Sequence, residues 1–443
     1  MAVAYDYDLV IIGGGSAGLS AARQASKRGK KVAIAEKNHI GGTCVNRGCI
    51  PTKLMVYASE FVQSSALAQS YGWSECDRTF DWPTFKQSMN NHLQSIRESI
   101  ADSLEGIEII KGEAQFVDAH TLEINDQKIT TDYVLVAVGS KPMMPDLPGI
   151  EHAIDSKTAL QLDELADSFI VVGGGYIGVE LAQFYRHLGK KVTIVDSNPH
   201  VLDKFDATIQ ARARETLERD GVIVVDEARL ESIEKTADGY RTILDNGKEL
   251  EAEQVLCALG RKPNTAQLNT DTVGLELKKG SIVVDDFKRT NVDNIFAVGD
   301  CTDTIMLTPI AKKEGEAAVD TMFGEPRKLD YRWVPSAVFI HPEHAMVGPT
   351  ENEAKEQNID YTVVESTFTP LKYAMPENAG MTSHIKVLVT PETEEIISVH
   401  LSIPRAADLV QMLVPALKKG LTLAELRETI AVHPSTGEEM FCL

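Results

Sequence analysis

Two cysteines, Cys44 and Cys49, are separated by four residues in the glycine-rich segment 41–53. At this spacing their sulfurs can form a disulfide across one helical turn. Pro51 favours the start of a helix, which we expect over residues 52–61, so Cys49 is expected at a helix N-terminus. A thiolate is stabilised and reactive there. The alternatives are a buried, unreacted pair or a metal site, but the sequence has no second Cys-x-x-Cys or nearby histidine cluster to complete a metal site.

Glycines in the spacing G-x-G-x-x-G occur twice, at an offset of 160 residues. The flanking sequence repeats as well, because residues 10–15 and 29–32 match residues 170–175 and 189–192. Each copy is typical of a strand, a tight turn and a helix whose N-terminus binds a pyrophosphate. One such motif is weak evidence, but two copies at one offset predict two dinucleotide sites and electron transfer between them. The glycines are Gly13, Gly15 and Gly18 in the first copy and Gly173, Gly175 and Gly178 in the second.

An acidic residue follows each glycine motif. Glu36 lies 18 positions after Gly18, and Asp196 lies 18 positions after Gly178. A carboxylate at about 20 residues from the turn accepts a hydrogen bond from a ribose hydroxyl in this kind of unit. The two acids therefore strengthen the prediction of two dinucleotide sites.

The length, charge and cysteine content of the chain indicate the broad class of protein. The length of 443 residues suggests about three domains, and no apolar run approaches the roughly 18 residues of a membrane helix. The early Asp6 and the strand-like residues 8–12 argue against a signal peptide. A net charge of −21 disfavours nucleic acids and anionic membranes as partners. Six cysteines are too few for a disulfide scaffold, which favours a cytoplasmic setting.

The remaining segments alternate between helices and strands. Residues 57–102 are expected to be largely helical, and residues 112–128 to form antiparallel strands. Buried strands are expected at residues 132–139 and 294–300. The tail from residue 334 alternates strands with helices such as residues 406–419. Cys76, Cys257 and Cys301 are interpreted as core residues, and His341 and His344 as loop residues.

Over essentially its whole length the chain resembles the pyridine nucleotide–disulfide oxidoreductases, which include glutathione, mercuric and mycothione reductases and dihydrolipoyl dehydrogenase. The Cys44–Cys49 segment is the most specific part of the resemblance. The resemblance implies an α/β fold with two Rossmann-type (three-layer ββα) nucleotide-binding domains and a C-terminal α+β dimerisation domain. FAD would bind residues 1–148 and 264–333, NAD(P)H would bind residues 149–263, and residues 334–443 would form the interface of a homodimer.

The resemblance also implies roles for single residues. Cys49 would be the thiol next to the flavin, and Cys44 would attack the substrate. Lys53 would lie near flavin N5 with Glu180 as its acidic partner. His433 would be the acid–base, supplied by the partner subunit, and Glu438 would hold its tautomer. The expected FAD contacts are Gly13, Gly15, Ser16, Gly18, Glu36, Gly42, Thr43, Lys53, Gly139 and Asp300, and the expected NAD contacts are Gly173, Gly175, Tyr176, Gly178, Asp196, Gly260 and Arg261.

The region after Asp196 favours NADH over NADPH. NADPH-dependent glutathione reductases carry two arginines at positions that align here with Ser197 and Asp203. Asp196 itself would accept a hydrogen bond from a free 2′-hydroxyl and repel a 2′-phosphate. We therefore expect NADH to be preferred.

The substrate is expected to be a low-molecular-weight disulfide of glutathione type. Arg23 matches an arginine that contacts a glutathione carboxylate, and residues 71–73 and 368–370 also resemble glutathione reductases. Three departures count against glutathione itself: a threonine at position 52, no tyrosine in residues 90–104, and Asn378 where a second arginine aligns. Fewer cations suit a less acidic, modified thiol.

Three other readings stay open. A dihydrolipoyl dehydrogenase would share the cofactors, although it usually has an apolar residue at the position of Arg23. A mercuric or other metal-ion reductase would require further thiols, for which Cys442 is the only candidate in the sequence. A flavin redox sensor would not require His433 or Glu438. No resident metal is expected.

Overall fold

The computed structural model describes residues 4–74, 79–375 and 381–443. It divides into two compact units. One contains Met1–Thr52, Pro83–Met143 and Gly260–Leu329, and the other contains Lys53–Trp82, Met144–Leu259 and Asp330–Leu443. Cys76 and Asn378 lie outside the described residues, so their interpretations stay predictions, as do the domain boundaries at residues 148, 263 and 333.

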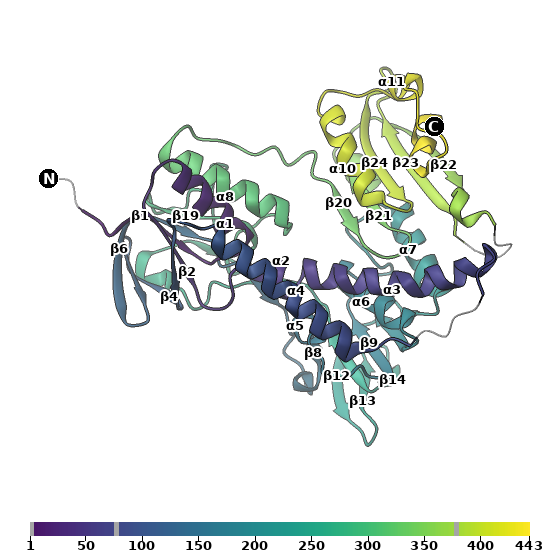
Figure 1. Ribbon diagram of the computed structural model, residues 1–443, viewed down its shortest axis with the longest axis horizontal. Helices are drawn as coiled ribbons and strands as arrows, with labels where there is room; N and C mark the ends of the chain where they lie inside the picture. Colours follow the sequence, from purple (N-terminus) through teal and green to yellow (C-terminus); the bar gives the residue numbers. More distant parts are fainter. Residues whose placement is uncertain (1–3, 75–78, 376–380) are drawn as a thin grey trace. The chain divides into compact units, whose positions relative to one another are not determined.

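A seven-stranded mixed sheet forms the centre of the first unit (Figure 1). Its order is β3-β2-β1-β6-β5-β4, with β19 paired to β6. β1, β2, β3, β6 and β19 run parallel, whereas β4, β5 and β6 are antiparallel. The antiparallel strands expected over residues 112–128 are therefore confirmed. The bounds are β1 Tyr7–Ile12, β2 Val32–Glu36, β3 Glu108–Lys111, β4 Ala114–Asp118, β5 Thr121–Ile124, β6 Gln127–Val136 and β19 Ile295–Ala297.

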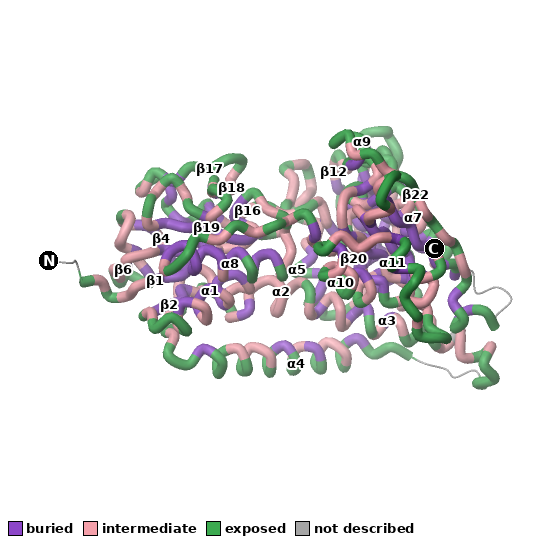
Figure 2. Tube along the Cα trace, turned by 90° about the horizontal axis from the view of Figure 1, so that it is seen from above, coloured by how far each residue is buried: buried purple, intermediate pink, exposed green. Residues whose placement is uncertain are grey.

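Helices α1 (Ser16–Lys27) and α8 (Thr308–Phe323) lie side by side in this unit (Figure 1). A Cβ atom at Gly315 would come within 2.4 Å of the Ala17 carbonyl oxygen, so glycine lets the two helix backbones touch. Figure 2 shows the buried strands β1 and β19 and the alternating burial along α4. Other elements are α2 Gly42–Arg47, α4 Trp82–Asp102, β7 Ser140–Pro142, β16 Arg261–Pro263, β17 Leu277–Lys278, β18 Ser281–Ile282, η2 Thr270–Val273 and η3 Gly299–Cys301.

The second unit contains a five-stranded parallel sheet in the order β11-β10-β9-β15-β8. In this sheet β9 is followed by a glycine turn and then by helix α6. This is the same order as β1 and α1 in the first unit, as the sequence repeat predicts. A separate antiparallel sheet, β12-β13-β14, is formed by the same stretch of chain. The bounds are η1 Ile150–His152, β8 Ile154–Asp155, α5 Ser156–Ala159, β9 Ser168–Val172, α6 Tyr176–His187, β10 Lys191–Val195, α7 Ala207–Arg219, β11 Ile223–Val225, β12 Leu230–Lys235, β13 Tyr240–Leu244, β14 Glu249–Ala252 and β15 Gln254–Cys257.

The C-terminal part of the second unit is an antiparallel sheet in the order β20-β21-β24-β23-β22. His344 begins β21 and is fully buried, so its interpretation as a loop residue was wrong. The predicted helix 406–419 is confirmed as α10. The bounds are α3 Cys49–Ser70, β20 Ser336–Val338, β21 His344–Val347, α9 Glu351–Glu356, β22 Thr362–Phe368, η4 Leu371–Tyr373, β23 Ser383–Val389, β24 Ile396–Ser402, α10 Ala406–Leu417, α11 Leu423–Glu428 and η5 Thr436–Cys442.

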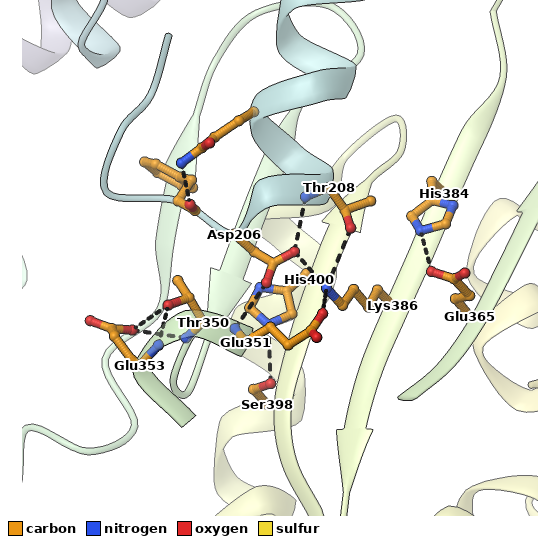
Figure 3. Close-up of polar contacts among 12 residues, drawn as sticks. Asp206, Thr208, Thr350, Glu351, Glu353, Glu365, His384, Lys386, Ser398 and His400 are labelled. Carbon is orange, nitrogen blue, oxygen red and sulfur yellow. Dashed lines mark hydrogen bonds and ion pairs between the residues drawn. The ribbon is translucent and has the colours of Figure 1, made fainter. Parts of the chain in front are cut away.

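Buried charges fix α7 to this sheet (Figure 3). The Lys386 ammonium lies 2.8 Å from Asp206 Oδ1 and 2.7 Å from Glu351 Oε2. Asp206 also accepts the Thr208 N–H and so caps α7. Burial would raise the pKa of Asp206, but His400 and Lys386 outweigh it and lower that pKa to about 2. The carboxylate is therefore ionised and paired, as a buried charge must be.

Candidate active site

Cys44 and Cys49 lie on two successive helices. Cys44 belongs to α2, Gly48 ends that helix, and Cys49 is the first residue of α3. A Cβ atom at Gly48 would lie 3.1 Å from the Thr43 carbonyl oxygen, which leaves little room for a larger residue in the turn. The expected helix N-terminus at Cys49 is confirmed, although the pair spans a break between helices and not one turn.

The two thiols have different proton affinities. Neither cysteine forms a disulfide in this structure; Cys49 is exposed and Cys44 is half-buried. The Cys44 thiol donates a hydrogen bond to the Cys49 sulfur, which lowers the pKa of Cys49 to about 6 and raises the pKa of Cys44. Thr308 Oγ1, at the start of α8, lies 3.5 Å from Cys49 Sγ and also lowers the pKa of Cys49. At neutral pH, Cys49 is therefore the thiolate and Cys44 the thiol.

No sequence motif predicts a role for Thr308. The only local sign of it is the Thr308-Pro309 step, which is typical of the first turn of a helix. Nothing in that step points to Cys49, which lies 259 positions earlier in the chain.

The first glycine motif forms an open helix N-terminus that fits a pyrophosphate. No side chain caps α1 at Gly15, so the first amides of the helix face outward. A Cβ atom at Gly42 would come within 2.6 Å of the Gly15 Cα, so glycine lets the two backbone segments approach each other closely. Glu36 accepts the N–H groups of Gly14 and Asn38 at 2.8 and 2.7 Å, and each oxygen keeps a lone pair for a ribose hydroxyl. The predicted residues Ser16, Gly18 and Thr43 lie in the same α1–α2 region.

The second glycine motif has the same geometry. Gly175 leaves α6 uncapped, and a Cβ atom there would meet nothing within 4 Å. Asp196 accepts the N–H groups of Gly174 and Asn198, just as Glu36 does in the first copy. Tyr176, the first residue of α6, is exposed. Both cradles therefore fit a dinucleotide.

Asp300 belongs to a hydrogen-bonded chain in the first unit. Ser140 donates its hydroxyl to Asp300 at 2.7 Å, and Arg261 donates to Ser140 Oγ at 2.8 Å. Gly260 and Arg261 fall within this unit, where β16 pairs with β7, and their expected role in NAD binding stays a prediction. The turn that carries Asp300 is fixed by the buried Glu314, which accepts the Gly299 N–H at 2.7 Å. Gly139 lies beside this chain, with a φ of +65°.

Arg23, the expected substrate contact, donates to Ser103 at 2.7 Å. A second cation that the sequence analysis missed, Arg97 of α4, donates to Asn46 at 3.2 Å. Asn46 in turn donates to the Gly42 carbonyl oxygen at 2.9 Å. Arg97 therefore contacts the segment that carries Cys44, whereas the substrate role of Arg23 stays a prediction.

Lys53 and Glu180 contact the same short segment after β20. The Lys53 ammonium lies 3.2 Å from Glu343 Oε1, and Glu180 accepts the Phe339 N–H at 2.9 Å. No sequence motif predicts a role for Glu343. The expected Lys53–Glu180 partnership stays a prediction.

His433 and Glu438 form a fixed pair. His433 Nδ1 lies 2.8 Å from Glu438 Oε2, and the other carboxylate oxygen accepts the Ser435 N–H at 3.2 Å. Ser435 in turn caps η5 through the Glu438 N–H. The hydrogen bond from His433 lowers the pKa of Glu438.

The His433 pair lines a cavity of about 810 Å³ in the second unit. The residues that the sequence analysis singled out for their resemblance to glutathione reductases line the same cavity: Tyr71, Trp73, Phe368, Thr369 and Pro370. Segments far apart in the chain are thus brought together at the candidate acid–base.

Two family models match the chain. The model described as pyridine nucleotide-disulphide oxidoreductase matches residues 7–315, and its dimerisation domain matches residues 334–441. The chain belongs to this family. It is an NAD(P)H-dependent disulfide oxidoreductase and a flavoprotein, and the α/β fold expected from the sequence is confirmed.

Several relatives are similar to the chain over nearly its full length. A glutathione reductase of Nostoc sp. is 35% identical over 456 residues, which cover 98% of both chains. A trypanothione reductase of Trypanosoma congolense is 34% identical, covering 98% of this chain and 94% of the relative. A dihydrolipoyl dehydrogenase of Geobacillus stearothermophilus is also 34% identical, covering 98% of this chain and 95% of the relative.

Neither a cluster of metal-binding side chains nor a membrane-spanning helix occurs among the described residues. Over residues 4–74, 79–375 and 381–443, no group of three or more His, Cys, Asp or Glu side chains could hold a metal ion. In the same ranges, no helix combines the length and the apolar content that crossing a membrane requires.

Proposed function

We propose that this protein uses NADH to reduce a low-molecular-weight disulfide of glutathione type, through FAD and the Cys44–Cys49 pair. The observation that carries this proposal is the unequal thiol pair, with the pKa of Cys49 lowered to about 6 and that of Cys44 raised. When bound, FAD would relay two electrons from the nicotinamide to the cysteine pair. The domain division at residues 148, 263 and 333 is part of the same proposal.

The raised pKa of Cys44 explains why the reaction would require a base. In the reduced pair, His433 Nε2 would accept the Cys44 proton while the sulfur attacks the substrate disulfide. One substrate thiolate leaves and is protonated by the imidazolium, and the other half stays bound to Cys44 as a mixed disulfide. The Cys49 thiolate then attacks the Cys44 sulfur. This step closes the Cys44–Cys49 disulfide and releases the second thiolate, which takes its proton from solvent.

His433 would act across the interface of a homodimer in the family pattern. The match of residues 334–441 to a dimerisation domain supports this arrangement. So does the exposure of large apolar side chains in the same part of the chain, because Ile430, Val432 and Met412 are 96%, 78% and 75% exposed. We also propose a cytoplasmic location, on the low cysteine content.

The anchoring of Asp196 supports the NADH preference. Its carboxylate is held by two backbone N–H groups, so it cannot easily turn away from a 2′-phosphate. Ser197 and Asp203 supply no cation at the aligned arginine positions. NADPH would therefore be the weaker donor.

Two kinds of substrate are compatible with this site: a bulky thiol disulfide and lipoamide. The similarity to glutathione and trypanothione reductases supports a bulky thiol disulfide. So does the cavity that Tyr71, Trp73 and residues 368–370 line together with His433. The similarity to a dihydrolipoyl dehydrogenase of comparable identity supports lipoamide as the second candidate.

A turnover panel tests the proposal. The purified holoenzyme would be assayed with glutathione disulfide, an amidated glutathione disulfide, cystine, lipoamide and Hg²⁺, each with NADH and with NADPH. We expect the highest kcat/KM with a glutathione-type disulfide and NADH. The highest value with lipoamide would assign the second candidate, and turnover of Hg²⁺ alone would refute disulfide reduction.

A further inference from the structure

Two acidic residues follow neighbouring strands at one edge of the parallel sheet in the second unit. β10 ends at Val195 and β11 ends at Val225, and these two residues are partners in the parallel register. Asp196 and Asp226 are the next residues of the two segments. Because the strands run parallel, both acids lie at the carboxyl edge of the sheet, where the second glycine motif also lies.

Backbone hydrogen bonds fasten the turns after these two strands to each other. The Ala228 N–H donates to the Asp196 carbonyl oxygen at 3.0 Å, and the Glu227 N–H donates to the Asn198 carbonyl oxygen at 3.2 Å. Asp226 begins the segment that makes both bonds. It is therefore held close to the segment that carries Asp196, the acid expected to bind the ribose.

Asp226 forms an ion pair with Arg214 of α7. The pair joins Arg214 Nη1 to Asp226 Oδ2, and Arg214 Nε lies 2.9 Å from Oε1 of Glu218, one helical turn further along α7. The hydrogen bond from Arg214 lowers the pKa of Asp226, so this carboxylate is ionised at neutral pH. The side chains of Arg214 and Asp226 are 31% and 35% exposed, so neither is sealed in the core.

We infer that the Asp226–Arg214 pair is a further determinant of donor specificity, in which Asp226 keeps the Arg214 guanidinium from binding a 2′-phosphate. This inference rests on the proposed NAD site at the second glycine motif. A guanidinium is a strong bidentate partner for a phosphate, but two nitrogens of Arg214 already contact carboxylates. Asp226 also adds a second negative charge near Asp196, and like charges repel. A free 2′-hydroxyl is neutral, so NADH is expected to be insensitive to the pair.

Binding of the oxidised donors measures this effect without turnover. The Kd of NAD⁺ and that of NADP⁺ would be determined by isothermal titration calorimetry on the oxidised holoenzyme. Asp226→Asn should lower the Kd of NADP⁺ by about fivefold and change the Kd of NAD⁺ by less than about twofold, as for one partly exposed charge. An unchanged ratio of the two Kd values would overturn the inference.

A double-mutant cycle tests whether Asp226 acts through Arg214. Arg214→Met alone leaves Asp226 unpaired and should raise the Kd of NADP⁺. Asp226→Asn combined with Arg214→Met replaces the ion pair by two neutral side chains, so NADP⁺ should bind about as tightly as to the wild type. If the double variant keeps the full gain of Asp226→Asn, the guanidinium does not bind the phosphate and the inference is wrong.

The dependence on salt separates a charge effect from a change in folding. The gain in Asp226→Asn is electrostatic, so it should shrink as the salt concentration rises. A gain that is independent of salt would contradict the inference. If Asp226→Asn folds poorly, Asp226→Ser removes the same charge and is measured in its place.

Glu251 offers a matched control. It also forms an ion pair with an arginine, Arg241, at 3.0 Å, but in the separate β12-β13-β14 sheet. Glu251→Gln should leave both Kd values unchanged. A gain for NADP⁺ equal to that of Asp226→Asn would assign the effect to the net charge of the chain and would overturn the inference.

The same measurements distinguish a failure of the inference from a failure of the proposed function. A wild-type holoenzyme that binds NADP⁺ more tightly than NAD⁺ would refute the proposed preference for NADH. If the wild type prefers NAD⁺ and Asp226→Asn has the same preference, only the role of the Asp226–Arg214 pair is wrong.

Discussion

The His433 ring donates its Nδ1–H to Glu438 Oε2 across 2.8 Å. The direction of this hydrogen bond follows from the partner, because an ionised carboxylate can only accept. Nδ1 therefore carries the proton, and Nε2 keeps its lone pair for a proton from another group. The exposed imidazole is thus prepared to act as a base.

The first prediction is that His433→Ala lowers disulfide turnover by roughly 10²–10⁴, the usual contribution of a general acid–base. Flavin reduction by NADH, followed by stopped-flow absorbance, should be nearly unchanged, because the proton transfer belongs to the disulfide half of the reaction. Glu438→Gln should cause a smaller loss, since it only orients the ring. Full turnover by His433→Ala would show that the acid–base lies elsewhere.

The sharing of the site between subunits can be tested with the same variant. Inactive His433→Ala chains would be unfolded and refolded together with inactive Cys44→Ser chains. Heterodimers formed in this way contain one intact site if His433 acts across the interface, so activity should return. Mixtures that stay inactive would place His433 and Cys44 of the same chain in one site.

The second prediction concerns the two thiols. In the two-electron-reduced enzyme, charge transfer from the Cys49 thiolate to the oxidised flavin should give a long-wavelength absorbance band. Cys44→Ser should abolish disulfide turnover but keep this band, because the Cys49 thiolate remains. Cys49→Ser should lose both. The opposite result, an absorbance band that survives in Cys49→Ser, would reverse the assignment of the flavin-proximal thiol.

The third prediction is that the Thr308 hydroxyl stabilises the Cys49 thiolate. Thr308→Val should raise the pKa of Cys49 above its value of about 6, by about 1, equivalent to one hydrogen bond of about 1.4 kcal/mol. The pH at which half of the long-wavelength absorbance appears reports this change. Thr308→Ser keeps the hydroxyl and should titrate like the wild type, and an unchanged titration in Thr308→Val would exclude the hydroxyl as a cause.

The fourth prediction is a preference for NADH over NADPH of at least about tenfold in kcat/KM, or about 1.4 kcal/mol. Replacing Asp196 by Ala, Ser197 by Arg and Asp203 by Arg should move the preference towards NADPH, because the two guanidinium groups can bind a 2′-phosphate. Steady-state kinetics with both donors check this. A wild-type enzyme that prefers NADPH would refute the role given to Asp196.

The fifth prediction concerns stability in acid. His344 is fully buried, and among the described residues neither of its ring nitrogens has a hydrogen-bond partner. Burial, with Arg212 and Arg219 nearby, lowers the pKa of His344 from the ordinary 6.5 to about 3. Between these values the unfolded chain binds a proton that the folded chain excludes, so the free energy of unfolding falls as the pH falls.

Urea unfolding at pH 8 and pH 5.5 measures this effect. His344→Leu should lose less stability than the wild type over this interval, by about 1.4 kcal/mol for one histidine. His92→Gln changes an exposed histidine of α4 and should behave like the wild type. An equal loss in His344→Leu and the wild type would show that His344 does not contribute to the acid sensitivity.

Local sequence determined the two nucleotide cradles and the cysteine segment. The glycines, the acids Glu36 and Asp196 and the pair Cys44–Cys49 all act within about 25 residues of chain, where spacing decides which atoms meet. Each motif therefore carries its own geometry, and the structure reproduces the two cradles with matching hydrogen bonds from Gly14 and Gly174.

Only the tertiary structure decided which distant side chains contact the candidate site residues. Thr308 reaches Cys49 from 259 positions away, and Glu343 reaches Lys53 from 290 positions away. His344, two residues after Pro342, looked like a loop residue, yet it begins a buried strand whose partners, β20 and β24, determine its place. Such contacts depend on how helices and sheets pack, and packing is set by the sum of many weak apolar contacts along the whole chain and not by any short pattern of residues.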